Sequence, residues 1–396
     1  MVFDKWNECS LGELANLKYG KTIRKKELSD DGYPVFSGYA IVGYLPTFDY
    51  EEPQLIIVCR GVGGTGDIKL SPAKSSITNL SIIIDSDPSK IDKSFLYWYL
   101  KHADTHSLRT GSAQPQIVIK DLEKFKIKIP PMSEQKAIAN ILSTLDEKIE
   151  TNNKINKKLE EMAQALFKHW FVDFEFPNEN GKPYKSSGGE MVESELGMIP
   201  KGWNVVTLEK IAELIMGLSP KSSTYNEDGI GLPLLNGAAD FDKNNLRPSR
   251  FTSDPKRVSK KEDWLLCIRG TIGNLTFSDG DYALGRGVAA IRAKESMYRE
   301  IIYFNLQKSI KELISLASGS VISGLSKQDI NNLKIITPDK KILTVFHNLI
   351  HKIQQEQIDL KSQNKVLSKI RDILLPKLMS GEIRVPLDNE TLVEQS

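Results

Sequence analysis

The second half of this chain repeats the first, and this duplication constrains the fold more than any other feature of the sequence. With a shift of 208 residues, Cys59 falls on Cys267. Nearer the start of each copy the best shift is 197, which aligns Gly20 with Gly217. The difference between the two shifts predicts about eleven extra residues in the second copy, in loops around 226–261. A repeat this long indicates two similar domains, because solenoid repeats are only tens of residues long.

Each copy begins with a globular part that mixes short strands and helices. Continuous apolar runs predict buried strands at 55–59, 80–84, 264–268 and 288–291. Apolar residues at helical spacing predict helices at 94–100 and 299–317. With many glycine-bearing loops between these runs, the pattern predicts two α+β globules.

A long helix is expected after each globule. Neither Gly nor Pro occurs between Ser133 and Trp170, and a helix of this length would extend about 57 Å. Ser133 is the expected N-cap, because its hydroxyl can accept a bond from the first turn. The second run starts at Asp339 and is predicted to end at Pro376, which cannot donate a backbone hydrogen bond.

Heptad spacing predicts that the two helices pair with each other. The residues expected to set the register are Leu145, Asn156, Leu159, Leu166, Leu360, Asn364, Leu367 and Leu374. Asn156 and Asn364 coincide under the shift of 208, and an Asn in such a seam fixes the register because only one alignment pairs the amides. The alternative is that each helix packs separately on its own globule. A turn-rich connector at 173–200 would let the helices run antiparallel.

Composition narrows the functional classes. The net charge is only +2, which argues against a strong solitary DNA-binding protein but permits local basic surfaces or DNA binding shared with a partner. The three cysteines have no zinc or disulfide spacing, and no apolar run is long enough to span a membrane. We therefore expect a reduced, cytoplasmic protein without a membrane partner.

Motifs for catalysis are incomplete. Residues 61–66 match GxGxxG, but Pro72 and the absence of a helical stripe after it exclude the helix that would hold a pyrophosphate. The sequence at 129–132 is Ile-Pro-Pro-Met, which lacks the amide or acid of a methyltransferase loop. The pairs His102/His106 and His347/His351 have metal-ligand spacing, but lacking a third ligand they are expected on solvated helix surfaces. We expect no catalytic residue, metal or cofactor.

Three segments resemble a known family. Residues 129–149 are similar to the first conserved region of type I restriction-modification specificity subunits, 171–203 to their central connector, and 374–383 to the end of their second conserved region. The resemblance covers nearly the whole chain in order. It implies two target recognition domains, each reading one half of a bipartite DNA sequence. It also implies assembly with two methyltransferase subunits, which modify adenines, and with ATP-driven translocase-nuclease subunits.

With this resemblance, the expected fold class is α+β: two similar target recognition domains separated by two long helices that form an antiparallel coiled coil, as a pseudo-two-fold repeat. The expected division is target recognition domain 1 at 1–132, helix 1 at 133–172, connector at 173–200, target recognition domain 2 at 201–338, helix 2 at 339–381 and a tail at 382–396. Because the globules have diverged, the two half-sites should differ and the target should be asymmetric.

DNA contacts are predicted by side-chain chemistry. Phosphates are bound by Lys and Arg, whereas base edges favour Arg for guanine and Asn or Gln for adenine. The candidates in Gly- or Pro-marked loops of the first copy are Lys21, Arg24, Lys25, Arg60, Lys69, Lys74, Arg109, Ser112, Gln114 and Gln116. Those of the second copy are Lys221, Asn236, Arg247, Arg250, Arg257, Arg269, Arg286, Ser320 and Ser323. The loops at 114–116 and 247–250 are favoured.

Two other functions remain open at this stage. The chain could be a coiled-coil scaffold that presents two protein- or carbohydrate-binding domains, which predicts no sequence-specific DNA retention. It could also be a single-chain modification enzyme, which predicts that the purified chain alone methylates or cuts DNA.

Overall fold

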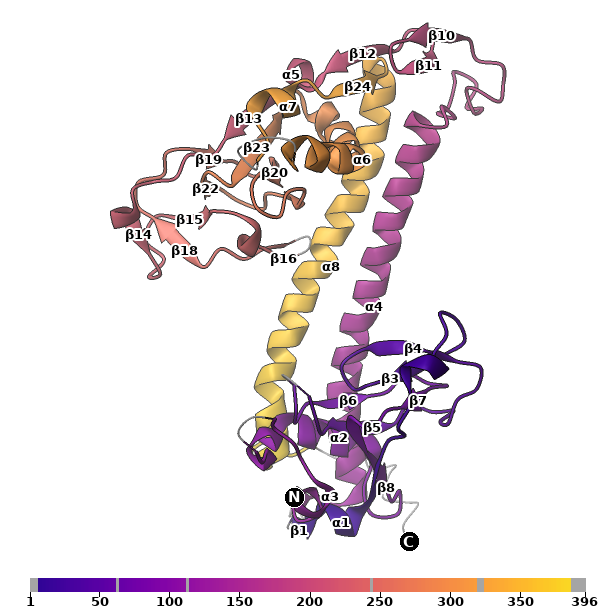
Figure 1. The fold of residues 1–396 in the computed structure, drawn as a ribbon, viewed down its shortest axis with the longest axis vertical. Coiled ribbons are helices and arrows are strands. Elements are labelled where there is room, and N and C mark those ends of the chain that lie inside the picture. The colour runs from indigo at the N-terminus through magenta and orange to yellow at the C-terminus, as the bar shows by residue number, and fades with distance from the viewer. Residues whose placement is uncertain (1–5, 62–63, 112–113, 243–244, 319–323, 386–396) are drawn as a thin grey trace. The chain divides into compact units, whose positions relative to one another are not determined.

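The chain forms two compact units (Figure 1). The structure is a computed structural model that describes residues 6–61, 64–111, 114–242, 245–318 and 324–385. Unit 1 consists of Met1–Lys154 and Leu360–Ser396, and unit 2 of Ile155–Asp359. Each unit therefore combines a globule with segments of two long helices that are far apart in the sequence.

The globule of unit 1 contains three sheets with short helices. Its strands are β1 (Asn7–Ser10), β2 (Ala15–Tyr19), β3 (Tyr33–Phe36), β4 (Ile41–Leu45), β5 (Leu55–Val58), β6 (Ile68–Leu70), β7 (Ser76–Ile77), β8 (Ser81–Ser86) and β9 (Lys126–Ile129). Its helices are α1 (Leu11–Leu14), α2 (Lys93–His102) and α3 (Ile119–Leu122), with 3-10 turns η1 (Lys25–Glu27) and η2 (Thr105–Leu108). The sheets have the strand orders β2-β8-β5-β6, β4-β3-β7 and β1-β9.

Unit 2 repeats this plan with additional strands. They are β10 (Met191–Ser194), β11 (Gly197–Pro200), β12 (Asn204–Thr207), β13 (Ala212–Met216), β14 (Tyr225–Asn226), β15 (Leu232–Leu235), β16 (Phe241–Asp242), β17 (Asn245–Leu246), β18 (Arg250–Thr252), β19 (Val258–Ser259), β20 (Trp264–Cys267), β21 (Leu275–Phe277), β22 (Tyr282–Leu284), β23 (Val288–Ala293) and β24 (Lys334–Thr337). The helices are α5 (Leu208–Ile211), α6 (Arg299–Ser318) and α7 (Lys327–Asn331), with 3-10 turns η3 (Ser222–Thr224), η4 (Ala238–Asp240) and η5 (Ser296–Tyr298).

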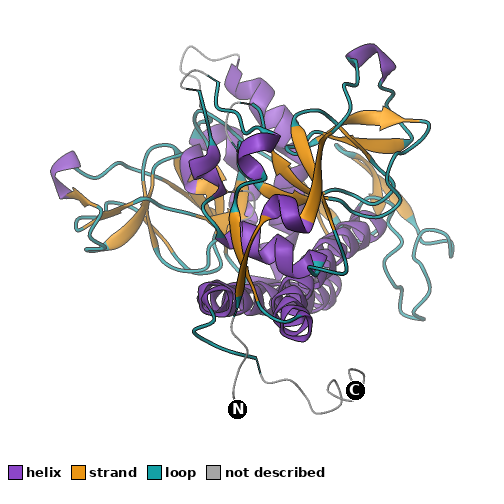
Figure 2. Ribbon diagram, turned by 90° about the horizontal axis from the view of Figure 1, so that it is seen from below, coloured by secondary structure: helices purple, strands orange, loops and turns teal. Residues whose placement is uncertain are grey.

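The sheets of unit 2 correspond to those of unit 1. The order β13-β23-β20-β21 matches β2-β8-β5-β6, and β12-β24 matches β1-β9. The small sheet β4-β3-β7 corresponds to the five-stranded β14-β18-β15-β22-β19, and the antiparallel pair β16-β17 is added. The extra elements lie in the region where the change in shift predicted an insertion, so the duplicated α+β fold is confirmed. Figure 2 distinguishes these strands, in orange, from the loops that connect them.

The strand register corrects the alignment of the cysteines. Val58 pairs with Ser81 in unit 1, and Cys267 pairs with Val288 at the equivalent position of unit 2. The counterpart of Cys267 is therefore Val58, one residue before Cys59. Because successive side chains alternate across a sheet, a one-residue offset moves a side chain to the opposite face. Cys59 accordingly packs with Leu55 in one core cluster, whereas Cys267 packs in a smaller cluster on the other face of its own sheet.

The two long helices are α4 (Met132–Phe171) and α8 (Lys340–Ser380). Ser133 is the second residue of α4, so its expected role as N-cap was wrong. The predicted end of α8 at Pro376 was also wrong, because Pro376 lies within the helix. A proline removes one helical hydrogen bond, but burial of Leu378 and Met379 in the core of unit 1 offsets this cost. The helix ends before Gly381, whose φ of 74° lies in the left-handed region.

Within each unit, α4 and α8 pair in opposite directions. In unit 1, Asp146 forms an ion pair with Arg371, whereas Asn152, further along α4, bonds with Asn364, which comes earlier in α8. In unit 2, the amide of Gln357 donates to the backbone oxygen of Asn156 at 3.2 Å. The antiparallel coiled coil is thereby confirmed in both units.

The asparagine pairing differs from the prediction. Asn152 Nδ2 donates to Asn364 Oδ1 at 2.8 Å, and Asn364 Nδ2 donates to Asn153 Oδ1 at 2.9 Å. Asn156, the residue expected to pair with Asn364, has a buried Oδ1 with no partner among the described residues. In an antiparallel pair, contacts join residues whose numbers sum to a constant, so residues that are equivalent by a shift do not face each other.

Candidate nucleic-acid interface

A shared backbone framework holds the candidate loops in each unit. In unit 1, Gly20 N–H donates to Ser81 O at 3.0 Å and Cys59 N–H donates to Leu80 O at 2.8 Å. A Cβ at Gly20 would lie 2.3 Å from Thr78 O, so only glycine permits this approach of the two loops. The framework places the segments after β2, β5 and β7 next to one another.

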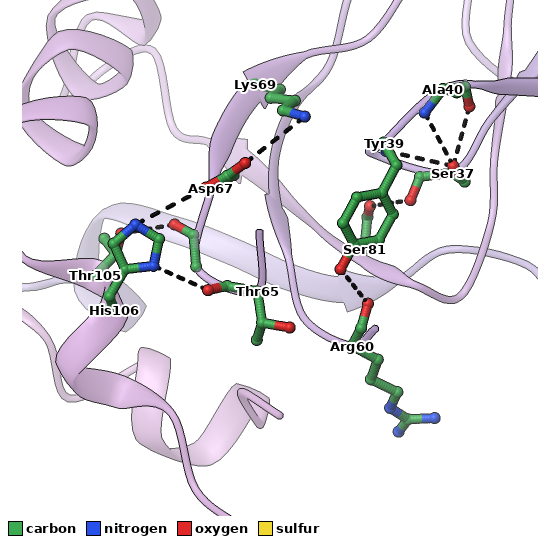
Figure 3. Close-up of polar contacts among 11 residues, drawn as sticks. Ser37, Tyr39, Ala40, Arg60, Thr65, Asp67, Lys69, Ser81, Thr105 and His106 are labelled. Carbon is green, nitrogen blue, oxygen red and sulfur yellow. Dashed lines mark hydrogen bonds and ion pairs between the residues drawn. The ribbon is translucent and has the colours of Figure 1, made fainter. Parts of the chain in front are cut away.

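Arg60 lies two residues after the end of β5, in the loops of unit 1 (Figure 3). Its guanidinium lies 5.4 Å from the centre of the Tyr19 ring, and it forms no ion pair with a described carboxylate. The Tyr39 hydroxyl donates to Arg60 O at 2.8 Å. Tyr39 thus fixes the backbone while the Arg60 side chain extends away from it and is exposed.

The turn after Arg60 packs against Tyr39. A Cβ at Gly61 would lie 2.5 Å from the Tyr39 hydroxyl oxygen, and one at Gly64 would lie 3.0 Å from the ring. Lys69 Nζ lies 5.8 Å from the centre of the same ring and 3.8 Å from Asp67 Oδ2. The GxGxxG segment therefore connects the antiparallel strands β5 and β6, and the described residues after it form β6 and not a helix, as expected.

The favoured loop at 114–116 lies beside Arg60. Gln116 forms isolated bridges with both Arg60 and Thr110. Gln116, Gln114 and Arg109 are exposed, so their side chains are accessible to a ligand. Ser112 lies outside the described residues.

Several other unit 1 candidates already have carboxylate partners. Lys21 forms an ion pair with Asp49, and Lys74 Nζ lies 3.3 Å from Glu51 Oε1. Arg24 and Lys25, at the start of η1, are exposed and form no ion pair with a described carboxylate. Exposed pairs contribute little to stability, so Lys21 and Lys74 can exchange their partners for a phosphate at small cost.

Unit 2 brings Asn236, Arg269 and Arg286 together. Gly287 O accepts from Ile268 N–H at 2.8 Å, which places the turn holding Arg286 beside the residue before Arg269. A Cβ at Gly285 would lie 2.2 Å from Asn236 Oδ1. All three side chains are exposed, and neither arginine forms an ion pair with a described carboxylate.

The remaining unit 2 candidates are spread over the five-stranded sheet and its loops. Arg247 Nη2 lies 3.1 Å from Asp242 Oδ2, whereas Arg250 begins β18. Arg257 and Lys221 are exposed and unpaired with any described carboxylate. Arg250 pairs with Leu234 of β15, and Arg247 N–H donates to Asp240 O at 2.8 Å, so the favoured 247–250 loop lies beside the segment that carries Asn236. Ser320 and Ser323 lie outside the described residues.

Sequence reasoning missed Tyr39, Asn79 and Thr22. Asn79 Nδ2 donates to Thr22 Oγ1 at 3.1 Å, in the turn between β7 and β8. The available signal was the equivalence of Asn79 with Arg286 under a shift of 207, which the register of β8 and β23 supports. For Tyr39, the neighbouring glycines Gly38 and Gly43 were a weaker indication that it lies in a loop near the site.

The cysteine thiols lie beneath these loops. Burial raises the pKa of Cys59 to about 11, and burial also raises the pKa of Cys267. Cys59 Sγ donates to Asn79 O at 3.7 Å, and Cys267 Sγ donates to Arg269 O at 3.2 Å. Both thiols therefore support loop backbone in their protonated form and are poor nucleophiles.

The expectation that the histidine pairs lie on solvated surfaces is met at three of the four positions, because His102, His106 and His351 are exposed. His102 ends α2, whereas His106 lies in the 3-10 turn η2, where its Nδ1 is 2.9 Å from Thr65 O. His347 differs from the expectation: it is half-buried on α8, with its Nδ1 2.6 Å from Glu300 Oε2. Among the described residues, no group of His, Cys, Asp and Glu has the arrangement of a metal site. In the part of the chain that is described, no helix is long and apolar enough to cross a membrane.

Comparison with known proteins identifies the class. The family model described as the type I restriction modification DNA specificity domain matches twice, at residues 4–161 and 200–363. A protein of Methanocaldococcus jannaschii named for the MjaX type I restriction enzyme specificity subunit is 29% identical over 313 residues, covering 77% of this chain and 71% of that protein. The HindI specificity subunit of Haemophilus influenzae is 26% identical over 332 residues, covering 68% of this chain and 71% of that protein.

The fold agrees with a solved structure. The S subunit of a type I restriction-modification system from M. genitalium superposes with a TM-score of 0.67 at 20% identity, covering 95% of this chain and 96% of that one. The two matched domains define a protein with a role in DNA sequence specificity. The chain belongs to the family of type I restriction-modification specificity subunits.

Proposed function

We propose that this chain reads a bipartite, asymmetric DNA target, with one half-site recognised by the globule of each unit. The observation that carries this proposal is the repetition of one loop framework around different side chains. Arg60 and Arg269 are equivalent, but Asn79 is replaced by Arg286 and Ser37 by Asn236. Equivalent loops with different hydrogen-bonding groups favour two half-sites of different sequence.

The proposed partners would supply the catalytic activities for which this sequence has no complete motif. Methylation of adenine and cleavage of DNA would be carried out by methyltransferase subunits and by translocase-nuclease subunits, with this chain as their non-catalytic specificity determinant. The modest net charge of +2 is consistent with DNA binding that is shared with such partners. Exposed arginines without carboxylate partners, such as Arg60 and Arg269, are the proposed base or phosphate contacts.

The decisive experiment is methylation mapping. The chain is expressed with its cognate methyltransferase subunit in a host without DNA methylation, and methyladenine is mapped by long-read sequencing. We expect one asymmetric bipartite motif, methylated in both halves, that disappears when this chain is omitted. A soluble complex of the two proteins that methylates no defined motif would contradict the proposal and favour the coiled-coil scaffold for protein or carbohydrate binding.

A matched pair of variants tests whether the loops of unit 1 determine which DNA motif is methylated. Arg60→Ala removes an unpaired guanidinium from the unit 1 loops, whereas Lys90→Ala removes an exposed cation that is paired with Asp87 at 3.4 Å. We expect Arg60→Ala to reduce methylation of the motif about tenfold or more, because a base contact contributes about 1–3 kcal/mol. Lys90→Ala should leave it unchanged. Methylation by the purified chain alone would instead support a single-chain modification enzyme.

A further inference from the structure

The turn before β8 in unit 1 and the turn before β23 in unit 2 each carry one polar side chain at the same position of the duplicated fold. In unit 1 this residue is Asn79, which precedes β8 by two positions, and in unit 2 it is Arg286, which precedes β23 by two positions. The turns are closed by matching bonds: Ser81 N–H donates to Thr78 O at 3.1 Å, and Val288 N–H donates to Gly285 O at 3.1 Å.

The surroundings of the two turns also match. Lys21 N–H donates to Ile77 O at 2.8 Å, and Leu218 N–H donates to Leu284 O at 2.9 Å. The glycine before each donor lies against the turn, since a Cβ at Gly217 would be 2.1 Å from Gly285 O. The duplicated backbone therefore delivers residue 79 and residue 286 to equivalent places beside an equivalent arginine.

Each presented side chain is held by a hydroxyl group. Asn79 Nδ2 donates to Thr22 Oγ1 at 3.1 Å, and Arg286 Nε donates to Ser219 Oγ at 3.4 Å. Thr22 and Ser219 are themselves equivalent, since each lies two residues after the close-packed glycine of its own unit, Gly20 or Gly217. One donor of each side chain is used for this bond, which orients the group. The second amide N–H and Oδ1 of Asn79, and both Nη groups of Arg286, form no hydrogen bond with the described residues.

We propose that Asn79 and Arg286 are matched specificity-determining residues that read different bases in the two half-sites. The inference rests on the proposed function. A free amide N–H and oxygen can bind both N7 and N6 of adenine, whereas a guanidinium can bind O6 and N7 of guanine. Unit 1 therefore requires an A·T pair at the position that Asn79 contacts, and unit 2 requires a G·C pair at the position that Arg286 contacts.

Reciprocal exchange tests this assignment. Asn79→Arg and Arg286→Asn are each assayed with the methyltransferase subunit on a DNA library that contains all four base pairs at every motif position. Asn79→Arg should convert one position of one half-site from A·T to G·C preference and leave the other half-site unchanged. Arg286→Asn should make the reverse change in the other half-site. Asn79→Ala and Arg286→Ala should each lower discrimination at that same position about tenfold or more.

The controls separate base reading from folding and from the proposed function. Asn16→Arg places an arginine at an exposed position of β2 outside the loops and should leave the motif unchanged. If Asn79→Arg does not assemble, the loss of discrimination in Asn79→Ala decides the assignment. A wild-type complex that reads a motif while both exchanges leave it unaltered, or alter the same half, would overturn this inference alone. A wild-type complex with no motif would instead refute the proposed function.

Discussion

The two units use one fold but attach their globules to the long helices with opposite chemistry. In unit 1, α2 packs against α4 through neutral groups: the Trp98 indole donates to Ser143 Oγ at 3.0 Å, and Asp92 N–H donates to Gln135 Oε1 at 2.8 Å. In unit 2, α6 packs against α8 through buried charges. Arg299 is 4% exposed and Glu300 is 0% exposed, with 2.7 Å between Arg299 Nη2 and Glu300 Oε1.

The buried charges of unit 2 form a closed network with α8. Arg299 Nη2 donates to His351 Nδ1 at 2.9 Å, and His347 Nδ1 lies 2.6 Å from Glu300 Oε2. Arginine has no acceptor, so Nδ1 of His351 must be unprotonated and accept the bond. The counterpart of His351 under the 208 shift is Ser143, the residue that holds Trp98 in unit 1. A single equivalent position thus anchors both globules, once by a hydroxyl and once by an imidazole.

The contacts between α4 and α8 show the reverse difference: they are polar in unit 1 and apolar in unit 2. In unit 1 the pair is polar, with Asn152 bonded to Asn364. In unit 2 it closes around aromatic rings, with Phe171 4.7 Å and Trp170 5.7 Å from Phe346 between ring centres. A duplicated fold therefore tolerates exchange of polar and apolar contacts between its two interfaces.

The largest expected effect comes from breaking the charge network. Glu300→Gln removes a buried negative charge and leaves the buried Arg299 with only the half-exposed Glu262 as a counter-ion, 3.0 Å from its Nη1, which should lower the free energy of unfolding of unit 2 by about 3–5 kcal/mol. The exposed Glu312→Gln on the same helix is the control and should change it by less than about 0.5 kcal/mol. Hydrogen exchange of α6 peptides against denaturant locates the loss. Equal protection in both variants would show that the network contributes little.

The neutral junction should be less sensitive. Ser143→Ala leaves the indole N–H of the buried Trp98 without a partner, at a cost of about 1–3 kcal/mol to unit 1. Thr151→Ala, at an exposed position of the same helix, provides the control. Exchange protection of α2 peptides measures the effect. A loss as large as that of Glu300→Gln would contradict the distinction between the two junctions.

The sequence was sufficient for elements that depend on local pattern. The apolar runs of β5 and β20 and the absence of Gly and Pro in α4 predicted these elements, because each reflects a local preference. The charge network could not be predicted, since His351 is 52 residues from Arg299 in the sequence and its role depends on tertiary packing. Asn364 was assigned the wrong partner because residues that are equivalent in the two copies of the repeat do not face each other when the helices pair antiparallel.

The candidate site was predicted in part for similar reasons. Loop chemistry singled out Arg60 and Arg269, which the framework brings to equivalent positions, and also Arg286, which lies beside Arg269. It did not find Tyr39, whose role arises only when the β3–β4 turn packs on the turn after β5. Asn79 was missed because a short polar residue in a turn usually serves the turn itself. The proposed role of Asn79 is inferred only from its equivalence with Arg286 in unit 2.

The contact between Asn152 and Asn364 in unit 1 provides a test in which a single and a double variant are expected to have different effects on stability. Asn364→Leu leaves the 0%-exposed Asn152 without its amide partner and should destabilise unit 1 by about 1–3 kcal/mol. The double variant Asn152→Leu/Asn364→Leu should be neutral or stabilising, because both polar groups are replaced together. Thermal unfolding and exchange of 140–154 peptides measure both. A double variant that is less stable than the single would show that the amide pair contributes net stability.

The smallest expected effect concerns the thiols beneath the two sets of loops. Both Cys59 and Cys267 are buried and have a raised pKa, so at pH 8 the thiolate fraction of each is below that of an ordinary cysteine. Native protein should therefore react with iodoacetamide first at the half-buried Cys9 and at the other two only after unfolding. Raising the pH through 11 should accelerate labelling of Cys59 as its thiolate forms. Mass spectrometry of labelled peptides follows each site, and fast labelling of Cys59 alone at pH 8 would show that the unit 1 loops open more readily than those of unit 2.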